Sequence, residues 1–206
     1  QSDIISCAYA SHGDTKQVLL FPEDPRECFD MAAESFDLAE RLQTPVIVMS
    51  DLDLGMNEFL CEPMVWDDER QYDRGKVFNQ QQLEEMSEKF GRYKDIDGDG
   101  IPYRTYPGTH PDKGAFFTRG TSRDPYAAYT ELSEVYIDNM ERLLHKWETA
   151  KGFVPEPELY QESNASKHGL LFFGTSTASC LEARDQLAAQ GIAVDCLRVR
   201  AFPFNQ

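Results

Sequence analysis

The chain has 206 residues, of which 41% are hydrophobic, and its formal net charge is −16. This acidity excludes non-specific binding to nucleic acid or to anionic membranes, because such binding requires a basic surface. No apolar run approaches the roughly 18 residues of a membrane span, and no signal peptide opens the chain. The length predicts one large domain or two small ones, with enough apolar residues for a core.

The cysteines are scattered along the chain and form no CxxC pair. A structural zinc site or an iron–sulfur cluster bound by this chain is therefore not expected, because both need closely spaced thiolates. An odd number of cysteines without a disulfide framework is typical of a reducing cytoplasm, where we expect this protein. The five residues are Cys7, Cys28, Cys61, Cys180 and Cys196.

A strand–helix–strand unit is predicted over residues 18–49. Residues 18–21 and 46–49 are short apolar runs typical of buried parallel strands. Between them, Asp24 is a helix cap with Pro25 at the first helical position and Glu27 three residues after the cap. The predicted helix runs to about residue 42, with an apolar face of Phe29, Ala32, Ala33, Phe36, Ala39 and Leu42.

A second unit of the same kind is predicted near the C-terminus, with strands at 169–173 and 193–199 and a helix at 178–189. A long helix is predicted from Asp124-Pro125 to about Gly152. The polar segment 153–166 is predicted to be a linker. The predicted fold is therefore α/β, with parallel-sheet βαβ units in two domains, one over residues 1–152 and the start of another over 167–206.

Residues 52–124 interrupt this alternation and form a long insertion, in which only 80–93 has helical character. Its densest part, residues 95–123, contains five Gly and three Pro. Long irregular loops in compact domains are usually functional or disordered. We expect an ordered loop here, because its apolar residues require burial: Ile101, Tyr103, Tyr106, Phe116 and Phe117.

Asp95, Asp97, Asp99 and Gly100 match the first half of an EF-hand calcium loop, but Tyr106 stands where the bidentate Glu is required. Two interpretations remain open. The three carboxylates either bind Ca²⁺ or Mg²⁺, or form a hydrogen-bonded Asp-Gly turn neutralised by Arg104 or Lys94. The Gly98-Asp99-Gly100 triplet lacks the later Asn pair of a magnesium–diphosphate motif, so that reading is rejected.

Other candidate site residues lie next to the predicted strands. His12 and Asp14 precede the first strand and are an acid–base pair or a loop turn. The second strand is followed by Asp51, Asp53 and Asn57, at the edge where doubly wound sheets bind ligands, although capping and turn roles are equally available. The turn at 174–176 either holds an anion or simply caps the following helix.

Three arginines stand out in the acidic insertion: Arg104, Arg119 and Arg123. Arginine binds carboxylates and phosphates in a bidentate manner, so these residues suit an anionic substrate. The other interpretation is that they tie the loop to its own carboxylates or to a partner subunit.

Four segments resemble the alpha subunit of 2-oxoacid:ferredoxin (acceptor) oxidoreductases of the 2-oxoglutarate type. They are QTPVIVMSDLDLGMNEFLCEP (43–63), YDRGKV (72–77), DGDGIPYRTYPGTHPDKGAFFTRGTSRD (97–124) and YIDNMERLLHKWETAK (136–151). The resemblance implies the later part of a thiamine pyrimidine-binding domain with a long insertion, followed by the start of a transketolase C-terminal-like domain. It also implies oxidative decarboxylation of a 2-oxoacid to an acyl-CoA, with ferredoxin as electron acceptor.

By this resemblance, thiamine diphosphate and Mg²⁺ are shared with a beta subunit, and the iron–sulfur cluster lies in the partner only. The implied partners are the beta subunit, ferredoxin through the complex, a 2-oxoacid and coenzyme A. His12 is the implied catalytic and substrate-carboxylate contact, with Arg104 and Arg119 as further substrate ligands. Both ends of the chain look cut, so we expect a fragment that is inactive alone.

Two other interpretations stay open. One is a non-catalytic, calcium-stabilised protein-interaction module that uses the Asp95–Asp99 carboxylates for metal and the aromatic loop for a partner. The other is an unrelated α/β binding domain in which the central loop acts as a lid.

Overall fold

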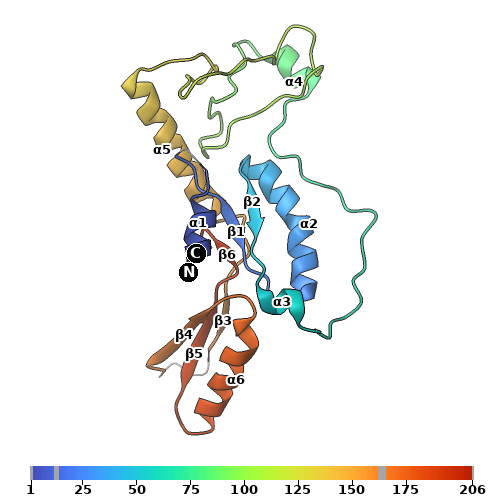
Figure 1. The fold of residues 1–206 in the computed structure, drawn as a ribbon. Coiled ribbons are helices and arrows are strands. Elements are labelled where there is room, and N and C mark those ends of the chain that lie inside the picture. Colours follow the sequence, from blue (N-terminus) through green and yellow to red (C-terminus); the bar gives the residue numbers. More distant parts are fainter. Residues whose placement is uncertain (1, 12–13, 162–165, 206) are drawn as a thin grey trace.

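A computed structural model describes residues 2–11, 14–161 and 166–205, which form two small three-stranded sheets with helices around them (Figure 1). The strand orders are β2-β1-β6 and β3-β5-β4. The helices are α1 (Ser2–Ala8), α2 (Pro25–Leu42), α3 (Leu52–Met56), α4 (Gln80–Glu85), α5 (Ser133–Ala150) and α6 (Ser176–Ala188). The strands are β1 (Val18–Leu20), β2 (Val46–Val48), β3 (Glu158–Tyr160), β4 (His168–Phe172), β5 (Val194–Arg198) and β6 (Ala201–Phe202).

The first predicted βαβ unit is confirmed. β1 and β2 pair in parallel, with Val18 opposite Val46, and α2 connects them. The Asp24 carboxylate accepts a hydrogen bond of 2.7 Å from the backbone N–H of Glu27, and Pro25 is the first helical residue. Local sequence therefore sets where α2 begins, because the cap satisfies an N–H group that has no partner within the helix.

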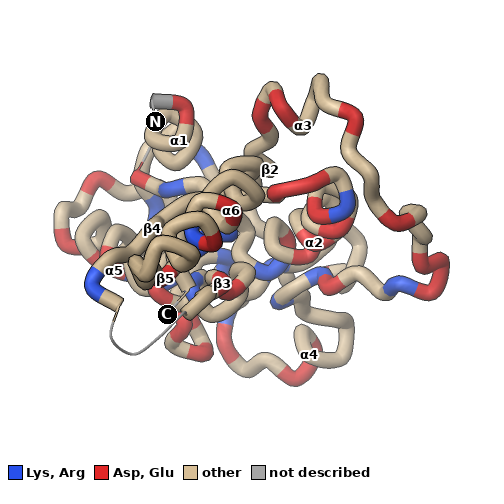
Figure 2. The backbone as a smooth tube through the Cα atoms, turned by 90° about the horizontal axis from the view of Figure 1, so that it is seen from below, with Lys and Arg blue, Asp and Glu red and all other residues tan. Residues whose placement is uncertain are grey.

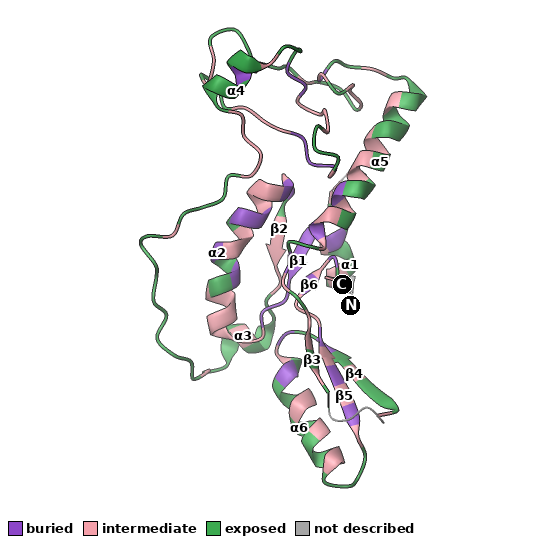
Figure 3. Cartoon of the chain, turned by 180° about the vertical axis from the view of Figure 1, so that it is seen from behind, coloured by how far each residue is buried: buried purple, intermediate pink, exposed green. Residues whose placement is uncertain are grey.

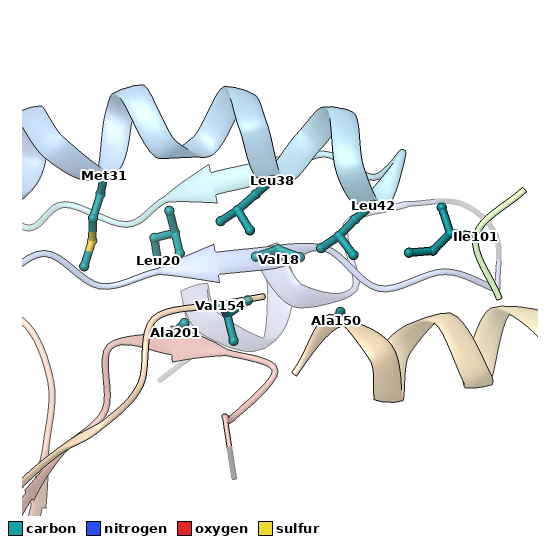
Figure 4. Packing of buried hydrophobic residues seen from close by; sticks show 9 residues of the cluster. All are labelled: Val18, Leu20, Met31, Leu38, Leu42, Ile101, Ala150, Val154 and Ala201. Atoms are coloured by element: carbon teal, nitrogen blue, oxygen red, sulfur yellow. The ribbon is translucent and has the colours of Figure 1, made fainter. Parts of the chain in front are cut away.

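The buried face of α2 agrees only in part with the predicted one, since Ala33 and Leu42 are buried as predicted but other predicted residues are not. Met31, Leu38 and Leu42 enter the core beside Val18 and Leu20 of β1 (Figure 4). Phe36, predicted to face the core, is 66% exposed, and Ala32 is exposed as well. The helix carries apolar residues on more than one side, so periodicity alone does not identify the side that packs on the sheet.

The loop of residues 58–74, which follows α3 and carries many acidic residues (Figure 2), contacts the outer side of α2 at Phe36 and Asp37. Phe36 makes an edge-on contact with Tyr72, with ring centroids 6.3 Å apart. The buried Asp37 carboxylate accepts hydrogen bonds of 2.8 Å from Arg70 and from the backbone N–H of Asp73. This carboxylate is the principal anchor of the loop, because buried charge-assisted hydrogen bonds are the strong ones.

The second predicted βαβ unit is also confirmed, since β4 and β5 pair in parallel and α6 connects them. Two short antiparallel strands were not predicted. β3 lies inside the segment 153–166 that was expected to be a linker, and it pairs with β5. β6 follows the second unit but returns to pair with β1 of the first sheet. The division into domains at 152 and 167 stays a prediction, and the α/β class is confirmed.

Two predicted helices are shorter than expected. α4 ends at Glu85, because Lys113 donates hydrogen bonds to the carbonyls of Glu84 and Met86 and closes the helix there. α5 begins at Ser133 and not at Asp124. The Asp124 carboxylate accepts from the backbone N–H groups of Tyr126 and Ala128 at 2.9 Å each, so a local Asp turn replaces the first helical turns.

The core runs across the whole first unit. Val18 and Leu20 pack towards α2 and α5, whereas Leu19 and Phe21 pack towards α1 on the other face of the sheet. Ile101 of the central loop is 2% exposed and belongs to the same core, as predicted (Figure 4). Three other loop residues expected to be buried are exposed: Tyr106, Phe116 and Phe117, at 46%, 42% and 79%. All five cysteines are free, and no helix in the described ranges combines the length and apolar character needed to cross a membrane.

A buried arginine joins the two sheets. Arg198 of β5 is 1% exposed, and parts of β5 are coloured as buried in Figure 3. The Arg198 guanidinium lies 3.0 Å from the carboxylates of Glu23 and Glu158 and also pairs with the carboxylate of Glu27. Glu27 belongs to α2 and Glu158 to β3. One cation therefore holds carboxylates from both units, which repel one another without it.

Replacing Arg198 with Met should lower the free energy of unfolding by about 3 kcal/mol, because removal of one partner leaves buried carboxylates without compensation. Urea unfolding measures the change. Arg26→Met is the matched control, because Arg26 pairs with Asp30 on the surface and its loss should leave the free energy of unfolding nearly unchanged. Equal losses in the two variants would contradict the assigned role of Arg198.

Candidate functional site

The Asp95–Gly100 segment forms a turn built on one carboxylate. Asp95 accepts hydrogen bonds from the backbone N–H groups of Gly98, Asp99 and Gly100, at 2.9, 3.3 and 2.8 Å. Gly98 and Gly100 have φ angles of 74° and 79°, a region that side chains other than Gly rarely adopt. The sequence therefore encodes this turn locally, through the alternation of Asp and Gly.

The carboxylates of Asp97 and Asp99 are neutralised by a lysine from outside the loop. Lys76 Nζ lies 2.7 Å from Asp97 Oδ2 and 2.7 Å from Asp99 Oδ1. The hydrogen bond from Lys76 lowers the pKa of Asp97. The predicted neutralising groups are wrong: Arg104 pairs with Glu40, and Lys94 pairs with Glu88. Sequence offered no signal for Lys76, which is brought here by the path of the chain.

This geometry matches the hydrogen-bonded turn and does not fit a bound divalent cation. The two Asp95 oxygens face backbone N–H groups, and the ammonium group of Lys76 lies between the other two carboxylates. Among the described residues, no group of three or more His, Cys, Asp or Glu side chains is arranged to hold a metal ion. The predicted metal role of Asp95, Asp97 and Asp99 therefore has no geometric support.

The turn is seated on α5 without space for a side chain. A Cβ added to Gly100 would lie 2.3 Å from the backbone N of Lys146 and 2.7 Å from the carbonyl O of Arg142. Arg142 donates to the Gly100 carbonyl at 3.0 Å, and Thr149 donates to the Asp99 carbonyl at 2.8 Å. The helix thus recognises the main chain of the loop directly, and Figure 1 shows the loop lying against α5.

Behind this contact lies a buried lysine. Lys146 is 9% exposed, and its Nζ donates to the Leu42 carbonyl at 3.1 Å and to Thr44 Oγ1 at 2.6 Å. These bonds join α5 to the end of α2. Burial, followed by the positive charges of Arg142 and Arg92, lowers the pKa of Lys146 to about 8. The interior of this acidic chain therefore contains a group of cations.

A cavity of about 320 Å³ lies between α5 and the loop segment 121–123. Its wall includes Asp14, which precedes β1, and the Asp14 carboxylate accepts a hydrogen bond of 3.0 Å from the Tyr136 hydroxyl. On the loop side, Arg123 donates to the Tyr93 hydroxyl at 3.2 Å, and its carbonyl accepts from Asn139 at 2.7 Å. This combination of Arg, Tyr, Asn and Asp makes the cavity a polar candidate binding site.

The predicted site residues are only partly brought together here. Asp14 and Arg123 border the cavity, whereas Arg104 and Arg119 do not. Arg104 donates to the Arg74 carbonyl at 2.7 Å and pairs with Glu40, and the Arg119 guanidinium lies 5.9 Å from the ring centre of Tyr129. The first of these fits the alternative in which an arginine ties the loop to the protein. His12 lies outside the described residues.

Sequence reasoning missed most of the cavity residues, among them Tyr136, Asn139 and Arg142 of α5. These three are spaced three apart on α5 and so share one side of the helix. The sequence signal that could have indicated them is this stripe of polar side chains along a helix whose other residues were assigned to the core.

The opposite edge of the sheet, predicted as a ligand site, is used for structural contacts. The Asp51 carboxylate accepts from the backbone N–H of Leu54 at 2.9 Å, which caps α3, and from the Thr175 hydroxyl at 2.6 Å. Asp53 lies within α3, and Asn57 ends it. Thr177 donates to the Gly174 carbonyl at 2.8 Å. The turn at 174–176 therefore contacts the first unit through Thr175, which makes no side-chain cap hydrogen bond to α6, and the choice between an anion site and a cap stays open.

These observations define the class of protein: an α/β domain with a long ordered insertion and a polar cavity beside it. A sequence-family model described as pyruvate flavodoxin/ferredoxin oxidoreductase, thiamine diphosphate-binding, matches residues 1–146. The chain belongs to this family.

Named relatives agree with this assignment. The chain is 28% identical over 213 residues to "2-oxoacid:ferredoxin oxidoreductase 2, subunit alpha" of Aeropyrum pernix, covering 99% of this chain and 31% of that protein. It is 42% identical over 64 residues to "2-oxoglutarate synthase subunit KorA" of Methanothermobacter marburgensis, covering 31% of this chain and 17% of that protein. The chain thus spans about a third or less of these relatives.

A solved structure has the same fold. It is a 2-oxoglutarate:ferredoxin oxidoreductase from Magnetococcus marinus with 2-oxoglutarate, coenzyme A and succinyl-CoA bound. The TM-score is 0.81 at 22% sequence identity, over 99% of this chain and 34% of that one. At this identity the likeness establishes the fold, and the α/β class predicted from sequence is confirmed.

Lys146 gives a pH-dependent test of this region. The pKa of about 8 in the folded protein is below the ordinary value of 10.5, so the unfolded chain binds more protons between these values. The free energy of unfolding should therefore rise from pH 8 to 10.5, by about 3 kcal/mol from this group. Lys146→Met should lack this rise, whereas the exposed-lysine variant Lys89→Met should keep it. Urea unfolding across this pH range measures the difference. If the free energy of unfolding changes with pH in the same way in Lys146→Met and in the wild type, the assigned pKa shift of Lys146 is refuted.

Proposed function

We propose that this chain is part of the alpha subunit of a 2-oxoacid:ferredoxin oxidoreductase, which oxidatively decarboxylates a 2-oxoacid to an acyl-CoA. The observation that carries the proposal is the family match over residues 1–146, supported by alpha-subunit relatives that align with 99% of the chain. The alternative of a calcium-stabilised interaction module draws no support from the Asp95 turn, because Lys76 already neutralises Asp97 and Asp99.

The proposed substrate is 2-oxoglutarate. Two observations favour it over other 2-oxoacids: the relatives named 2-oxoglutarate synthase, and the 2-oxoglutarate bound in the similar solved structure. A second carboxylate distinguishes 2-oxoglutarate from pyruvate, so its recognition requires an additional cationic or hydrogen-bonding group.

Thiamine diphosphate, when bound, would supply the carbanion stabilisation that decarboxylation requires. The described residues do not fit the whole cofactor, because they offer no cluster of acidic side chains for Mg²⁺ beside a diphosphate. In our proposal, the diphosphate and its metal ion are therefore held by the beta subunit, and this chain contributes only part of the surrounding wall. The iron–sulfur cluster is likewise assigned to the partner.

In our proposal, this chain forms part of the wall around the cofactor and supplies charged side chains to it. His12 is proposed to contact the substrate carboxylate, and Arg104 and Arg119 stay as predicted substrate ligands. The nearest described support for His12 is Asp14, two residues along the chain, which borders the polar cavity. The beta subunit, ferredoxin, the 2-oxoacid and coenzyme A are the proposed partners, and this segment alone is expected to be inactive.

The test is co-expression of the complete subunit that contains this chain with its neighbouring beta subunit. The complex should reduce a viologen dye only when 2-oxoglutarate and coenzyme A are both present. His12→Ala should lower kcat/KM for 2-oxoglutarate by about 10- to 100-fold, which corresponds to one lost hydrogen bond to a charged group.

His168→Ala is the matched control, because His168 is exposed on β4 and should leave kcat/KM unchanged within about twofold, as is usual for surface substitutions. Absence of dye reduction with every 2-oxoacid tried would sink the proposed function. Activity that is unaffected by His12→Ala would instead remove His12 from the proposed site and leave the reaction class intact.

A further inference from the structure

Three arginines gather around one tyrosine at the wall of the cavity next to α5. The guanidinium groups of Arg92 and Arg123 each lie 5.3 Å from the ring centre of Tyr93. Arg123 also donates to the Tyr93 hydroxyl at 3.2 Å. Arg142 lines the same cavity from α5. Positive charge is therefore concentrated at this one place in a chain whose net charge is −16.

None of these arginines forms a direct ion pair with a carboxylate in the described residues, although the negative charge of Asp95 partly offsets that of Arg142 at longer range. Over residues 2–11, 14–161 and 166–205, no Asp or Glu oxygen lies within 4.0 Å of a side-chain nitrogen of Arg92, Arg123 or Arg142. Their protein partners are neutral: Gln43 for Arg92, Tyr93 and Gly120 for Arg123, and Gly100 for Arg142.

Part of this charge is also shielded from solvent. Arg92 Nη1 and Arg142 Nε are buried and lack a hydrogen-bond partner, and burial lowers the pKa of both guanidinium groups. Desolvated cations without a directly paired carboxylate are costly, so an anion bound nearby would stabilise them. The one carboxylate at the cavity wall, Asp14, already accepts a hydrogen bond from Tyr136.

We propose that this cavity binds a small dianion through a phosphate or carboxylate group, with Arg123 as its direct ligand and Arg142 and Arg92 supplying positive potential. The cavity of about 320 Å³ is large enough for such a group together with part of its parent molecule. Thr121 and Ser122 add hydroxyl groups to the same wall. Anion binding in this cavity requires neither the proposed reaction nor a redox partner. Failure of this proposal can therefore be told apart from failure of the proposed function.

Inorganic phosphate is the probe, titrated calorimetrically into the purified protein that contains this chain. Ser122→Asp places a carboxylate in the cavity wall without removing a side-chain hydrogen bond described for Ser122, and Ser122→Asn is its neutral control of similar size. We expect Ser122→Asp to weaken phosphate binding by about 10- to 100-fold and Ser122→Asn by less than threefold, since only the first introduces repulsion.

A second pair of variants tests the direct ligand. Arg123→Gln should weaken phosphate binding by a similar factor, whereas Arg74→Gln removes an equal charge from a side chain that is 64% exposed and does not line the cavity. If Arg123→Gln fails to fold, the Ser122 pair still decides the question. Competition with succinate and with adenosine monophosphate then tells whether the natural group is a carboxylate or a phosphate ester.

Saturable phosphate binding that is weakened by Ser122→Asp and retained in Ser122→Asn and Arg74→Gln is the supporting result. Two results would overturn the proposal. One is the absence of saturable binding of phosphate, succinate or adenosine monophosphate to the wild-type protein. The other is equal weakening by Arg74→Gln and by the cavity variants, which would indicate only a general electrostatic attraction.

Discussion

The seating of the Asp95–Gly100 turn on α5 is the contact on which the arrangement of the insertion depends. The helix meets the main chain of the turn at Gly100, where no side chain fits, and donates hydrogen bonds to its carbonyls from Arg142 and Thr149. Ile101 then follows directly into the hydrophobic core. Close packing and satisfied backbone groups therefore hold a segment that has no regular secondary structure of its own.

The same helix connects the insertion to the electrostatics of the candidate site. Lys146 lies behind the turn and binds the end of α2, while Arg142, one helical turn earlier, reaches both the turn and the cavity. An acidic protein thus keeps cations inside, and one of them, Arg142, lines the cavity. Such a wall suits a family whose substrates are anionic, because a desolvated guanidinium binds carboxylates and phosphates more strongly than an exposed one.

The parts predictable from sequence were those that short-range chemistry determines. Asp24 and Pro25 define the start of α2, and the apolar runs define the two parallel strand pairs. The turn at Asp95 was open between two interpretations, because its decisive partner, Lys76, is distant in sequence. β6 could not be foreseen either, since a two-residue strand exists only through its pairing with β1. The cavity joins residues from four separate segments, so periodicity could indicate its α5 side alone.

Hydrogen exchange of the backbone amides of residues 95–123 is the most direct test of the central claim, that packing on α5 orders the insertion. Gly98→Ala and Gly100→Ala place a side chain at nearly the same strained φ, but an added Cβ has nothing within 4 Å at Gly98 and meets Lys146 and Arg142 at Gly100. The account predicts exchange at least about tenfold faster throughout the insertion in Gly100→Ala, and a smaller, local change in Gly98→Ala. Equal and local effects of the two substitutions would contradict it.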